Sequence, residues 1–295
     1  MDDGRSRTLV LKRLDYTTAA LPAASFLPFN ISHTERLIFA SSESDQRFIA
    51  RPLVIIGPDN FKGDSIALVV MEDLAPRWAR PRLHHDYALV VHRIDDIHDS
   101  MSRLVKNGLE GKRLIRYDEA FADPLIEFFE RSIMTDISME DDEELASLSS
   151  RWSDIKNALT GSTLPEVPST FVHGDFVPAH IFIRWLPIPK IRLIDFEWLG
   201  FGPPHADLAS LLKRARPSIE RLSLRLYSVQ HPDFSPDEHK FMYEWCQLCR
   251  GLLDAAYLVM HRKMMVPRKE PVVSRYARSS LRRTFLAAER LRMAR

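Results

Sequence analysis

FVHGDFVPAHIFI (residues 171–183) and IRLIDFEW (residues 191–198) are two short apolar runs that each carry polar groups at one end. A turn containing two prolines separates the runs, so we expect them to pair as an antiparallel hairpin. Asp175 leads a tight loop before one strand, and Asp195 ends the other. Pairing would place His180, at the start of the first strand, beside Asp195. The pattern therefore predicts that Asp175, His180 and Asp195 surround one small volume.

This group of side chains is typical of phosphoryl transfer. That reaction needs a carboxylate to orient the attacking hydroxyl, and metal ions to neutralise charge between the β- and γ-phosphates. Asp195 is a suitable Mg²⁺ ligand, and His180 is a candidate second ligand, although Mg²⁺ prefers oxygen. Asp175 then remains available as the base that accepts the hydroxyl proton.

The same segment resembles the Brenner-type motif of aminoglycoside phosphotransferases, written HGDxxxxN and followed by IDxxxxxxGxxxxDLA. Its matching residues are His173-Gly174-Asp175 through His180, then Ile194-Asp195, Gly202 and Asp207-Leu208-Ala209. The resemblance implies an α+β, bilobal, protein-kinase-like fold with a small, shortened β-rich N-lobe and a large helical C-lobe. It also implies ATP or GTP as phosphate donor, Mg²⁺ as cofactor, and a hydroxyl group of an antibiotic-like molecule or metabolite as acceptor.

The resemblance assigns a role to each matched side chain. Asp175 corresponds to the catalytic base, Asp195 and His180 to the metal ligands, and Asp207 to a structural carboxylate that braces the catalytic loop. His173 is likewise assigned a structural role. The family's usual residue at the position of His180 is Asn, but macrolide phosphotransferases and some aminoglycoside 2″-kinases have a similar His. Choline-type kinases share the sequence Ile-Asp-Phe-Glu around Asp195, so this group of kinases is an open alternative.

The N-terminal third carries the expected donor site. The sequence Val10-Leu11-Lys12 resembles the kinase strand whose Lys holds the α- and β-phosphates. Ser32 and Glu35 form a capping box that opens a predicted helix through about Ser41, and Glu35 would pair with Lys12. Met71 and Glu72 would contact adenine through backbone groups. Without the downstream motif, Lys12 would be read as a surface residue and Glu35 as a helix cap only.

The rest of the chain supports a two-part organisation. We expect a strand at Thr8–Leu14 and a hairpin of Leu53–Ile56 with Ile66–Met71. Apolar residues at helical spacing predict helices over 90–104, over 145–159 with an end at Gly161, and over about 205–215, 236–262 and 273–293. The expected division is 1–76 for the nucleotide-binding lobe and hinge, and 77–295 for the helical lobe.

One departure from the kinase pattern concerns the N-terminus. Only eleven residues, with a single glycine, precede Lys12. Kinase-like folds place two strands and a phosphate-covering loop there, and the loop's N–H groups cradle the phosphates. The chain either starts late or is a reduced member, and we expect weak nucleotide binding in both cases. The Thr8–Leu14 strand would then be an exposed edge through which the chain can self-associate.

Composition restricts the other partners. The chain has 295 residues, 45% hydrophobic and 27% charged, and no apolar run long enough to cross a membrane. Two cysteines cannot form a disulfide framework, and the acidic start does not resemble a signal peptide, so we expect a cytoplasmic protein. Residues 262–295 carry eleven Lys and Arg and two Glu, which leaves the remaining chain acidic, so nucleic acid is an unlikely partner.

Two other functions compete with a small-molecule kinase. A catalytically impaired kinase-fold protein that binds or scaffolds is favoured by the missing glycine loop and opposed by the intact Asp175 and Asp195. A protein kinase is disfavoured because the His-Arg-Asp and Ala-Pro-Glu signatures are missing from the sequence. Five acidic residues within 138–144 fit a helix N-terminus and could also attract a cationic substrate.

Overall fold

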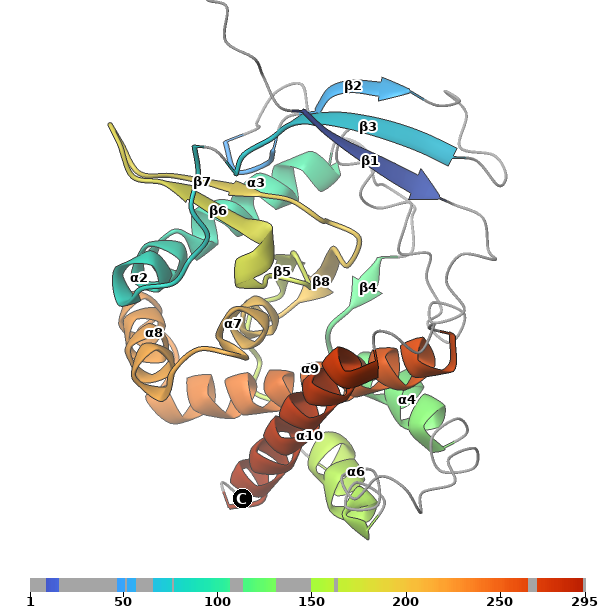
Figure 1. Cartoon of the computed structure of the whole chain (residues 1–295). Coiled ribbons are helices and arrows are strands. Elements are labelled where there is room, and N and C mark those ends of the chain that lie inside the picture. The colour runs from blue at the N-terminus through green and yellow to red at the C-terminus, as the bar shows by residue number, and fades with distance from the viewer. Residues whose placement is uncertain are drawn as a thin grey trace, which may run out of the picture.

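A computed structural model places a small antiparallel sheet above a larger body of helices (Figure 1). The structure describes residues 9–15, 47–50, 52–56, 66–75, 77–106, 114–130, 150–161, 164–264 and 270–293. Within these ranges, every helix is either too short or too polar to cross a membrane. The predicted helix that begins at Ser32, with Glu35, lies outside the described residues.

The upper sheet has three strands, β1 (Leu9–Asp15), β2 (Pro52–Ile56) and β3 (Ile66–Glu72). They pair in the order β1-β3-β2, and both pairings are antiparallel, so the predicted hairpin of β2 and β3 is confirmed. Val69 and Met71 on the central strand are buried. β1 lies at an edge of the described sheet and exposes Leu9 and Leu11.

The predicted hairpin in the middle of the chain is also confirmed, as β6 (Ile181–Arg184) paired antiparallel with β7 (Lys190–Leu193). Neighbouring segments extend this hairpin on both sides. Ala79 exchanges two backbone hydrogen bonds with Ile183 of β6, at 2.8 and 2.7 Å. The backbone at Phe48–Ala50 bonds to Leu193 of β7. These bonds fix the end of β7, and with it Asp195, relative to the segments that flank the upper sheet.

The remaining described elements are mostly helical. A second small sheet pairs β4 (Ile115–Arg116), β8 (Gly200–Gly202) and β5 (Thr170–Val172) in that order, and a short 3₁₀ turn, η4 (Pro178–His180), precedes β6. The helices are α2 (His84–His92), α3 (Ile94–Lys106), α4 (Glu119–Phe128), α6 (Trp152–Thr160), α7 (His205–Leu212), α8 (Pro217–Gln230), α9 (Pro236–Met264) and α10 (Glu270–Met293).

Helix boundaries show where the sequence prediction needs correction. The single helix expected over 90–104 is two helices, α2 and α3, because the backbone leaves helical geometry at Arg93, with φ −104° and ψ 9°. The helices α4 and α8 were not predicted, since a proline lies inside α4, and α8 exposes the apolar Leu222 and Val229, which obscures its apolar spacing. The predicted end at Gly161 is confirmed, as its N–H bonds to Asn157 at 2.9 Å. The first residues of that predicted helix lie outside the described residues.

The hydrophobic core of the helical body is organised around α9. Trp245, Tyr243 and Leu248 on this helix are at most 1% exposed, and α9 packs against both α7 and α10 (Figure 1). Cys246 and Cys249 lie on the same buried surface as free thiols, and burial raises the pKa of both. They act as packing residues in the core.

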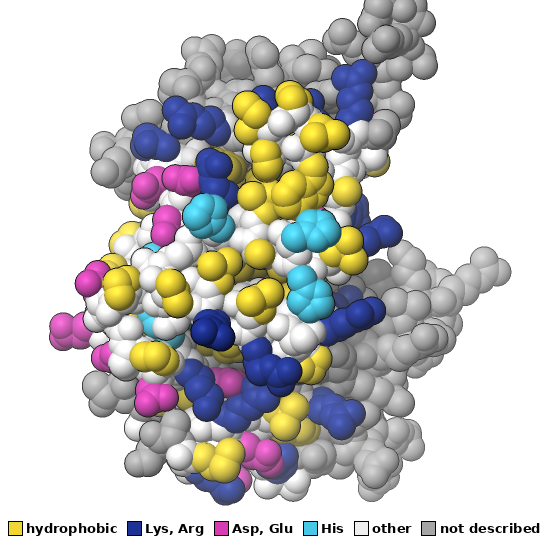
Figure 2. Space-filling view, turned by 90° about the vertical axis from the view of Figure 1, so that its left-hand side faces the viewer, with side chains coloured by type: hydrophobic (Ala, Val, Ile, Leu, Met, Phe, Trp, Pro, Cys, Tyr) yellow, Lys and Arg dark blue, Asp and Glu magenta, His cyan; other side chains and the backbone are white. Residues whose placement is uncertain are grey.

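Hydrophobic and basic side chains gather on different parts of the surface that contains α2 and α8. Figure 2 shows hydrophobic side chains gathered in its upper half and many Lys and Arg side chains below them. The turn between β6 and β7 contributes exposed Leu186 and Ile188, and Leu83 is exposed before α2. The proline-containing turn predicted between the two strands therefore lies at the surface.

A buried pair of histidines connects α7 to α9. His239 Nε2–H donates to the carbonyl of His231 at 2.9 Å, so in a neutral ring its Nδ1 accepts the bond from His205 Nε2 at 3.1 Å. His205 is fully buried. Burial, His239 and His231, in that order, lower the pKa of His205 to about 3. The native state therefore holds His205 in its neutral form.

This arrangement predicts acid-sensitive stability. Because the pKa of His205 is lower in the folded than in the unfolded chain, its contribution is complete above the unfolded value of about 6.5 and is lost as pH falls toward 3. We expect the free energy of unfolding to fall by about 2 kcal/mol from this group between about pH 7.5 and about pH 5. Urea titrations at both pH values measure it, and His205→Gln should flatten the dependence. An unchanged slope in the variant would contradict the assignment.

Candidate active site

The buried carboxylate of Asp207, in the first turn of α7, holds the loop that leads to Asp175. Its Oδ2 accepts hydrogen bonds from His173 N–H at 2.8 Å and from His98 Nε2 at 2.9 Å. Its Oδ1 accepts the Gly174 N–H at 2.9 Å. Asp207 is fully buried, so these donors supply the compensation that a buried charge requires. The bracing role that the sequence motif implies for Asp207 stays a prediction.

Gly174 is required at its position for two reasons. Its φ of +75° lies in the left-handed region that side chains other than glycine rarely adopt. A Cβ there would also lie 2.1 Å from both the Trp198 carbonyl and the Tyr117 hydroxyl. These two groups are already bonded to each other, because Tyr117 donates to the Trp198 carbonyl at 2.7 Å. The loop therefore passes too close to its neighbours for any larger residue.

His173 connects this loop to the end of β7. Its Nε2 is 3.0 Å from the Ile194 carbonyl and must therefore carry the proton, while its Nδ1 accepts the Asp175 N–H at 3.3 Å. Burial is the main reason that the pKa of His173 lies below its ordinary value, although Asp207 opposes the shift. A neutral ring with both nitrogens bonded thus ties the backbone of Asp175 to the residue before Asp195.

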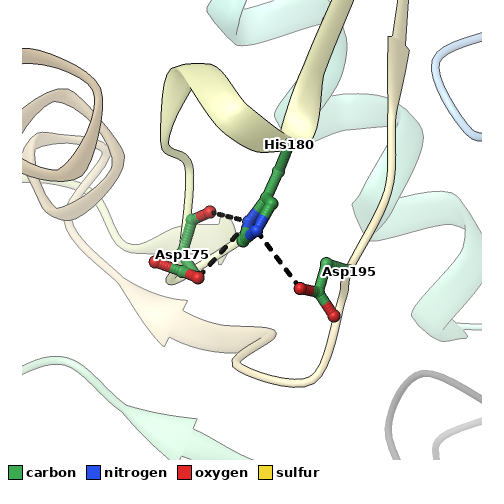
Figure 3. Close-up of side chains that lie close together, drawn as sticks. All are labelled: Asp175, His180 and Asp195. Atoms are coloured by element: carbon green, nitrogen blue, oxygen red, sulfur yellow. Dashed lines mark hydrogen bonds and ion pairs between the residues drawn. The ribbon is translucent and has the colours of Figure 1, made fainter. Parts of the chain in front are cut away.

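The structure brings Asp175, His180 and Asp195 together, as the hairpin predicted (Figure 3). His180 lies between the two carboxylates, with Nδ1 3.3 Å from Asp175 Oδ2 and Nε2 3.2 Å from Asp195 Oδ2. One ligand atom from each residue falls within 4.8 Å of the others. Asp195 has a φ of +69°, an uncommon value for a residue other than glycine, and one that Asp tolerates better than most. Such strained positions cluster at functional sites.

The donor set fits a divalent cation. His180 Nδ1 lies 3.0 Å from the Asp175 carbonyl, which only accepts hydrogen bonds, so Nδ1 carries the proton. In a neutral ring, Nε2 then presents a lone pair to the carboxylate of Asp195. Two such acceptors at 3.2 Å repel each other unless a proton or a cation lies between them. Carboxylate oxygens and a neutral imidazole are suitable metal ligands, with the carboxylates preferred by Mg²⁺.

Arg250 on α9 contacts Asp175 from the opposite side. Its Nη2 lies 2.6 Å from Asp175 Oδ1, and its Nη1 donates to the Gly174 carbonyl at 2.6 Å. Its Nε bonds to Asp254 at 3.0 Å, and Asp254 in turn contacts Lys213 at 3.1 Å. Burial raises the pKa of Asp175, but Arg250, His180 and Lys213 together outweigh it, so the pKa lies below its ordinary value. Asp175 is therefore ionised at neutral pH.

Lys12 reaches the site from the upper sheet. Its Nζ lies 2.6 Å from Asp195 Oδ1 and 3.6 Å from Glu197 Oε1. Burial raises the pKa of Glu197, while Lys12 lowers it less. The predicted pairing of Lys12 with Glu35 stays a prediction, because Glu35 lies outside the described residues.

The predicted adenine contacts lie at the end of β3. Met71 is buried there, and the chain leaves the sheet after Glu72. The Asp73 carboxylate then accepts the Ala75 N–H at 3.0 Å, which turns the chain toward the helical body.

Sequence reasoning missed the cationic side of the site. Arg250 and Asp254 lie 75 or more residues from Asp175 in sequence, and Lys213 lies at the end of α7. One signal was available. Gln247, Arg250 and Asp254 recur at helical spacing within an otherwise apolar part of α9, and polar residues on a buried helix surface need partners.

Comparison with known proteins identifies a family. Residues 38–244 match the profile of the phosphotransferase enzyme family. A search of curated protein sequences found no match.

Several solved structures share the fold. A microcompartment-associated aminopropanol kinase is 17% identical, with a TM-score of 0.62 over 99% of this chain and 88% of its own. The GDP and kanamycin complex of APH(2″)-IIia is 11% identical, with a TM-score of 0.60 over 88% and 85% of the two chains. A choline/ethanolamine kinase family protein from Mesorhizobium loti is 13% identical, with a TM-score of 0.56 over 96% and 83%. The predicted bilobal, protein-kinase-like α+β fold is thereby confirmed.

The role of Asp207 can be tested through stability. Asp207→Asn removes the charge and points an NH₂ group at one of the three donors, His173, Gly174 or His98. Since hydrogen bonds to a charged group each contribute about 1.5–3 kcal/mol, we expect the free energy of unfolding to fall by about 3 kcal/mol. Urea denaturation measures it. The exposed Asp99→Asn on α3 is the matched control and should change stability by less than about 0.5 kcal/mol. Similar losses in both variants would count against the bracing role.

Proposed function

Because the chain belongs to the phosphotransferase enzyme family, we propose that it transfers the γ-phosphate of ATP or GTP to a hydroxyl group of a small molecule. The observation that carries this proposal is the position of Asp175. One of its carboxylate oxygens faces the His180–Asp195 pair and the other is bonded to Arg250. A single ionised carboxylate thus borders a candidate cation site on one side and is held by Arg250 on the other.

Asp175 is the proposed catalytic base. In the reaction, the acceptor oxygen forms a bond to the γ-phosphorus, the bond to the bridging oxygen breaks, and ADP or GDP leaves. The hydroxyl proton passes to the Asp175 carboxylate. The low pKa of Asp175 keeps it ionised and ready to orient the hydroxyl. Arg250 acts as a positioning residue, because it fixes Asp175 Oδ1 and the adjacent Gly174 carbonyl.

His180 and Asp195 are the proposed metal-binding residues. A bound Mg²⁺ would neutralise charge on the β- and γ-phosphates. Asp207 and His173 are proposed to hold the backbone around this pair, through the hydrogen bonds to Gly174 and to the Ile194 carbonyl. The orientation of Asp195 therefore depends on residues that do not touch the substrate.

The donor nucleotide is proposed to bind between the upper sheet and this site. Lys12 would contact the phosphates, Glu35 would pair with Lys12, and the backbone at Met71 and Glu72 would contact adenine. Lys12 lies on Asp195 in this structure, so a bound triphosphate would compete for its ammonium. Several solved neighbours were determined with GDP or ADP, which supports a nucleotide donor.

The two parts of the chain are proposed to have different roles. Residues 1–76 are proposed to form the nucleotide-binding part and hinge, and residues 77–295 the catalytic loop and acceptor site. The cytoplasm, where ATP and GTP are available, is the proposed location. Small hydroxyl compounds named for the neighbours, including aminopropanol, choline and kanamycin, support an acceptor of that size.

Replacing the base tests the proposal directly. Asp175→Asn keeps an oxygen that accepts the Arg250 bond but cannot take up the hydroxyl proton. We expect phosphate transfer from γ-labelled ATP or GTP to fall by about 10²–10⁴-fold while the melting temperature changes little. Full transfer by the variant would remove Asp175 from this role. A wild-type protein that binds Mg²⁺–nucleotide yet transfers no phosphate to any acceptor would favour the binding or scaffolding alternative.

The metal assignment generates a separate prediction. Asp195→Ala should weaken Mg²⁺-dependent binding of ADP by about tenfold or more, because it removes a charged ligand, and should leave binding of adenosine nearly unchanged. Calorimetry with and without Mg²⁺ measures both. His180→Asn should retain activity, because an Asn oxygen can replace the imidazole nitrogen as a ligand. The assignment fails if Mg²⁺ strengthens ADP binding equally in the wild type and in Asp195→Ala.

A further inference from the structure

The turn that joins β6 to β7 presents exposed apolar side chains at the periphery of the molecule. Leu186 and Ile188 in this turn are 79% and 66% exposed, Trp185 beside them is 37% exposed, and Leu83 before α2 is 57% exposed. We refer to these four residues as the apolar tip. The hairpin projects outward on the left of Figure 1, and Figure 2 shows hydrophobic side chains gathered in the upper half of this surface. Exposed apolar side chains that gather in one place mark contact surfaces.

The apolar tip is fixed to the start of α2. Trp185 Nε1–H donates to Asp86 Oδ1 at 3.1 Å, and its ring meets the His85 ring edge to face with centroids 5.1 Å apart. Asp86 Oδ2 accepts the N–H groups of Leu83 at 2.9 Å and of Arg82 at 3.0 Å. One buried carboxylate thus holds the two apolar segments together. The tip is therefore ordered before it meets a partner, which lowers the entropic cost of binding.

Cationic side chains surround the apolar tip. Residues 77–86 and 184–192 lie side by side, because Ala79 and Ile183 exchange two backbone hydrogen bonds. The two segments together carry six Lys and Arg and a single acidic residue, the buried Asp86, which gives them a net formal charge of +5. The six cations are Arg77, Arg80, Arg82, Arg184, Lys190 and Arg192.

Three of these cations keep a charge that a partner can use. Arg82 and Lys190 are exposed to solvent. Arg184 lies over the Trp78 ring, with its guanidinium carbon 5.1 Å from the ring centroid. An aromatic face attracts a cation but carries no net charge, so it does not neutralise the guanidinium group. An anionic surface beside the tip would therefore be attracted to it.

The combination of features fits the surface of a lipid bilayer. Segments that bind at the interface of a membrane place aliphatic side chains among the acyl chains and Trp at the level of the headgroups. Their Lys and Arg side chains attract anionic headgroups. Single-stranded nucleic acid fits less well, because it needs open aromatic faces on which bases stack. The most exposed tip residues, Leu186 and Ile188, are aliphatic, and the Trp78 ring is already covered by Arg184.

We propose that the apolar tip and its surrounding cations dock the protein on an anionic membrane surface. The inference goes beyond the proposed function and does not depend on it. Contact of this kind needs no helix that crosses the bilayer. His180 and Asp195 lie at the other end of the same hairpin, next to the pairing of Ile181 with Leu193. Docking through the tip would therefore leave the candidate site accessible to ligands from the aqueous side.

Vesicle binding tests this inference with the full chain. Sedimentation with vesicles of phosphatidylcholine alone is compared with sedimentation with vesicles of an equimolar mixture of phosphatidylcholine and phosphatidylglycerol. We expect binding to the anionic vesicles to be stronger by about tenfold or more, because each Lys or Arg at an anionic surface contributes about fivefold. Raising the salt concentration should weaken this binding, since salt screens the attraction to the headgroups.

Matched apolar variants locate the contact. Leu186→Ser combined with Ile188→Ser should weaken binding to the anionic vesicles by about tenfold or more, because two aliphatic side chains no longer leave water. Leu222→Ser combined with Val229→Ser changes two exposed apolar side chains on α8 and should have no effect. All four positions are exposed, so the melting temperatures should stay close to that of the wild type.

Matched charge variants test the electrostatic part. Arg82→Gln combined with Lys190→Gln should weaken binding to the anionic vesicles by about tenfold or more and should reduce its salt dependence. Lys240→Gln on α9 removes an exposed positive charge away from the tip and should leave binding unchanged.

Several results would overturn the inference. These are a wild type that binds neither kind of vesicle, one that binds both equally, and apolar tip variants that behave like the α8 variants. Two further measurements identify the other possible occupants. A wild-type dimer in sedimentation velocity that Leu186→Ser with Ile188→Ser dissociates, without vesicle binding, would assign the tip to a second copy of the chain. Binding of a single-stranded RNA oligonucleotide that Arg82→Gln with Lys190→Gln abolishes, again without vesicle binding, would assign the surface to nucleic acid.

Discussion

A buried carboxylate governs the geometry of the candidate site. Asp207 is fully shielded from water, so its charge must be compensated by fixed donors, and the loop residues His173 and Gly174 supply two of them. His98 of α3 supplies the third. A shift of the loop would leave a charge unpaired in the interior, and such a loss costs several kcal/mol. The position of Asp175 is therefore set by the electrostatics of a residue that it does not contact through its side chain.

Backbone conformation transmits this constraint to the other half of the site. His173 spans from the Asp175 N–H to the Ile194 carbonyl, and Asp195 follows with a positive φ. The left-handed turn at Asp195 ends β7 and directs the carboxylate toward His180 (Figure 3). Backbone strain of this kind costs about 1–3 kcal/mol and persists only where surrounding contacts enforce it. Here the enforcing contacts are the His173 bridge on one side and the bonds between β7 and Phe48–Ala50 on the other.

The part of the site that could be predicted from sequence is the part that is local in sequence. Asp175, His180 and Asp195 lie within 21 residues and one hairpin, so pairing of two apolar strands was enough to bring them together. The contact of Arg250 with Asp175 could not be predicted in this way, because the two residues are far apart in sequence. They meet only because α9 packs against α7 and α10. The sequence around a single Arg in a helix does not indicate which acidic residue the Arg contacts. The break between α2 and α3 at Arg93 could not be predicted from the sequence either, because apolar residues continue at helical spacing across it.

The acidic groups of the candidate site are held in place by neighbouring cations. Asp175 Oδ2 borders His180, where a cation is favoured, while its Oδ1 is bonded to Arg250. Lys12 holds Asp195 in the same way that Arg250 holds Asp175, so each acidic group of the site has a cation beside it. A metal with its nucleotide would exchange these internal partners for new ones, because the phosphates would compete for the ammonium of Lys12 and the cation for the carboxylate of Asp195.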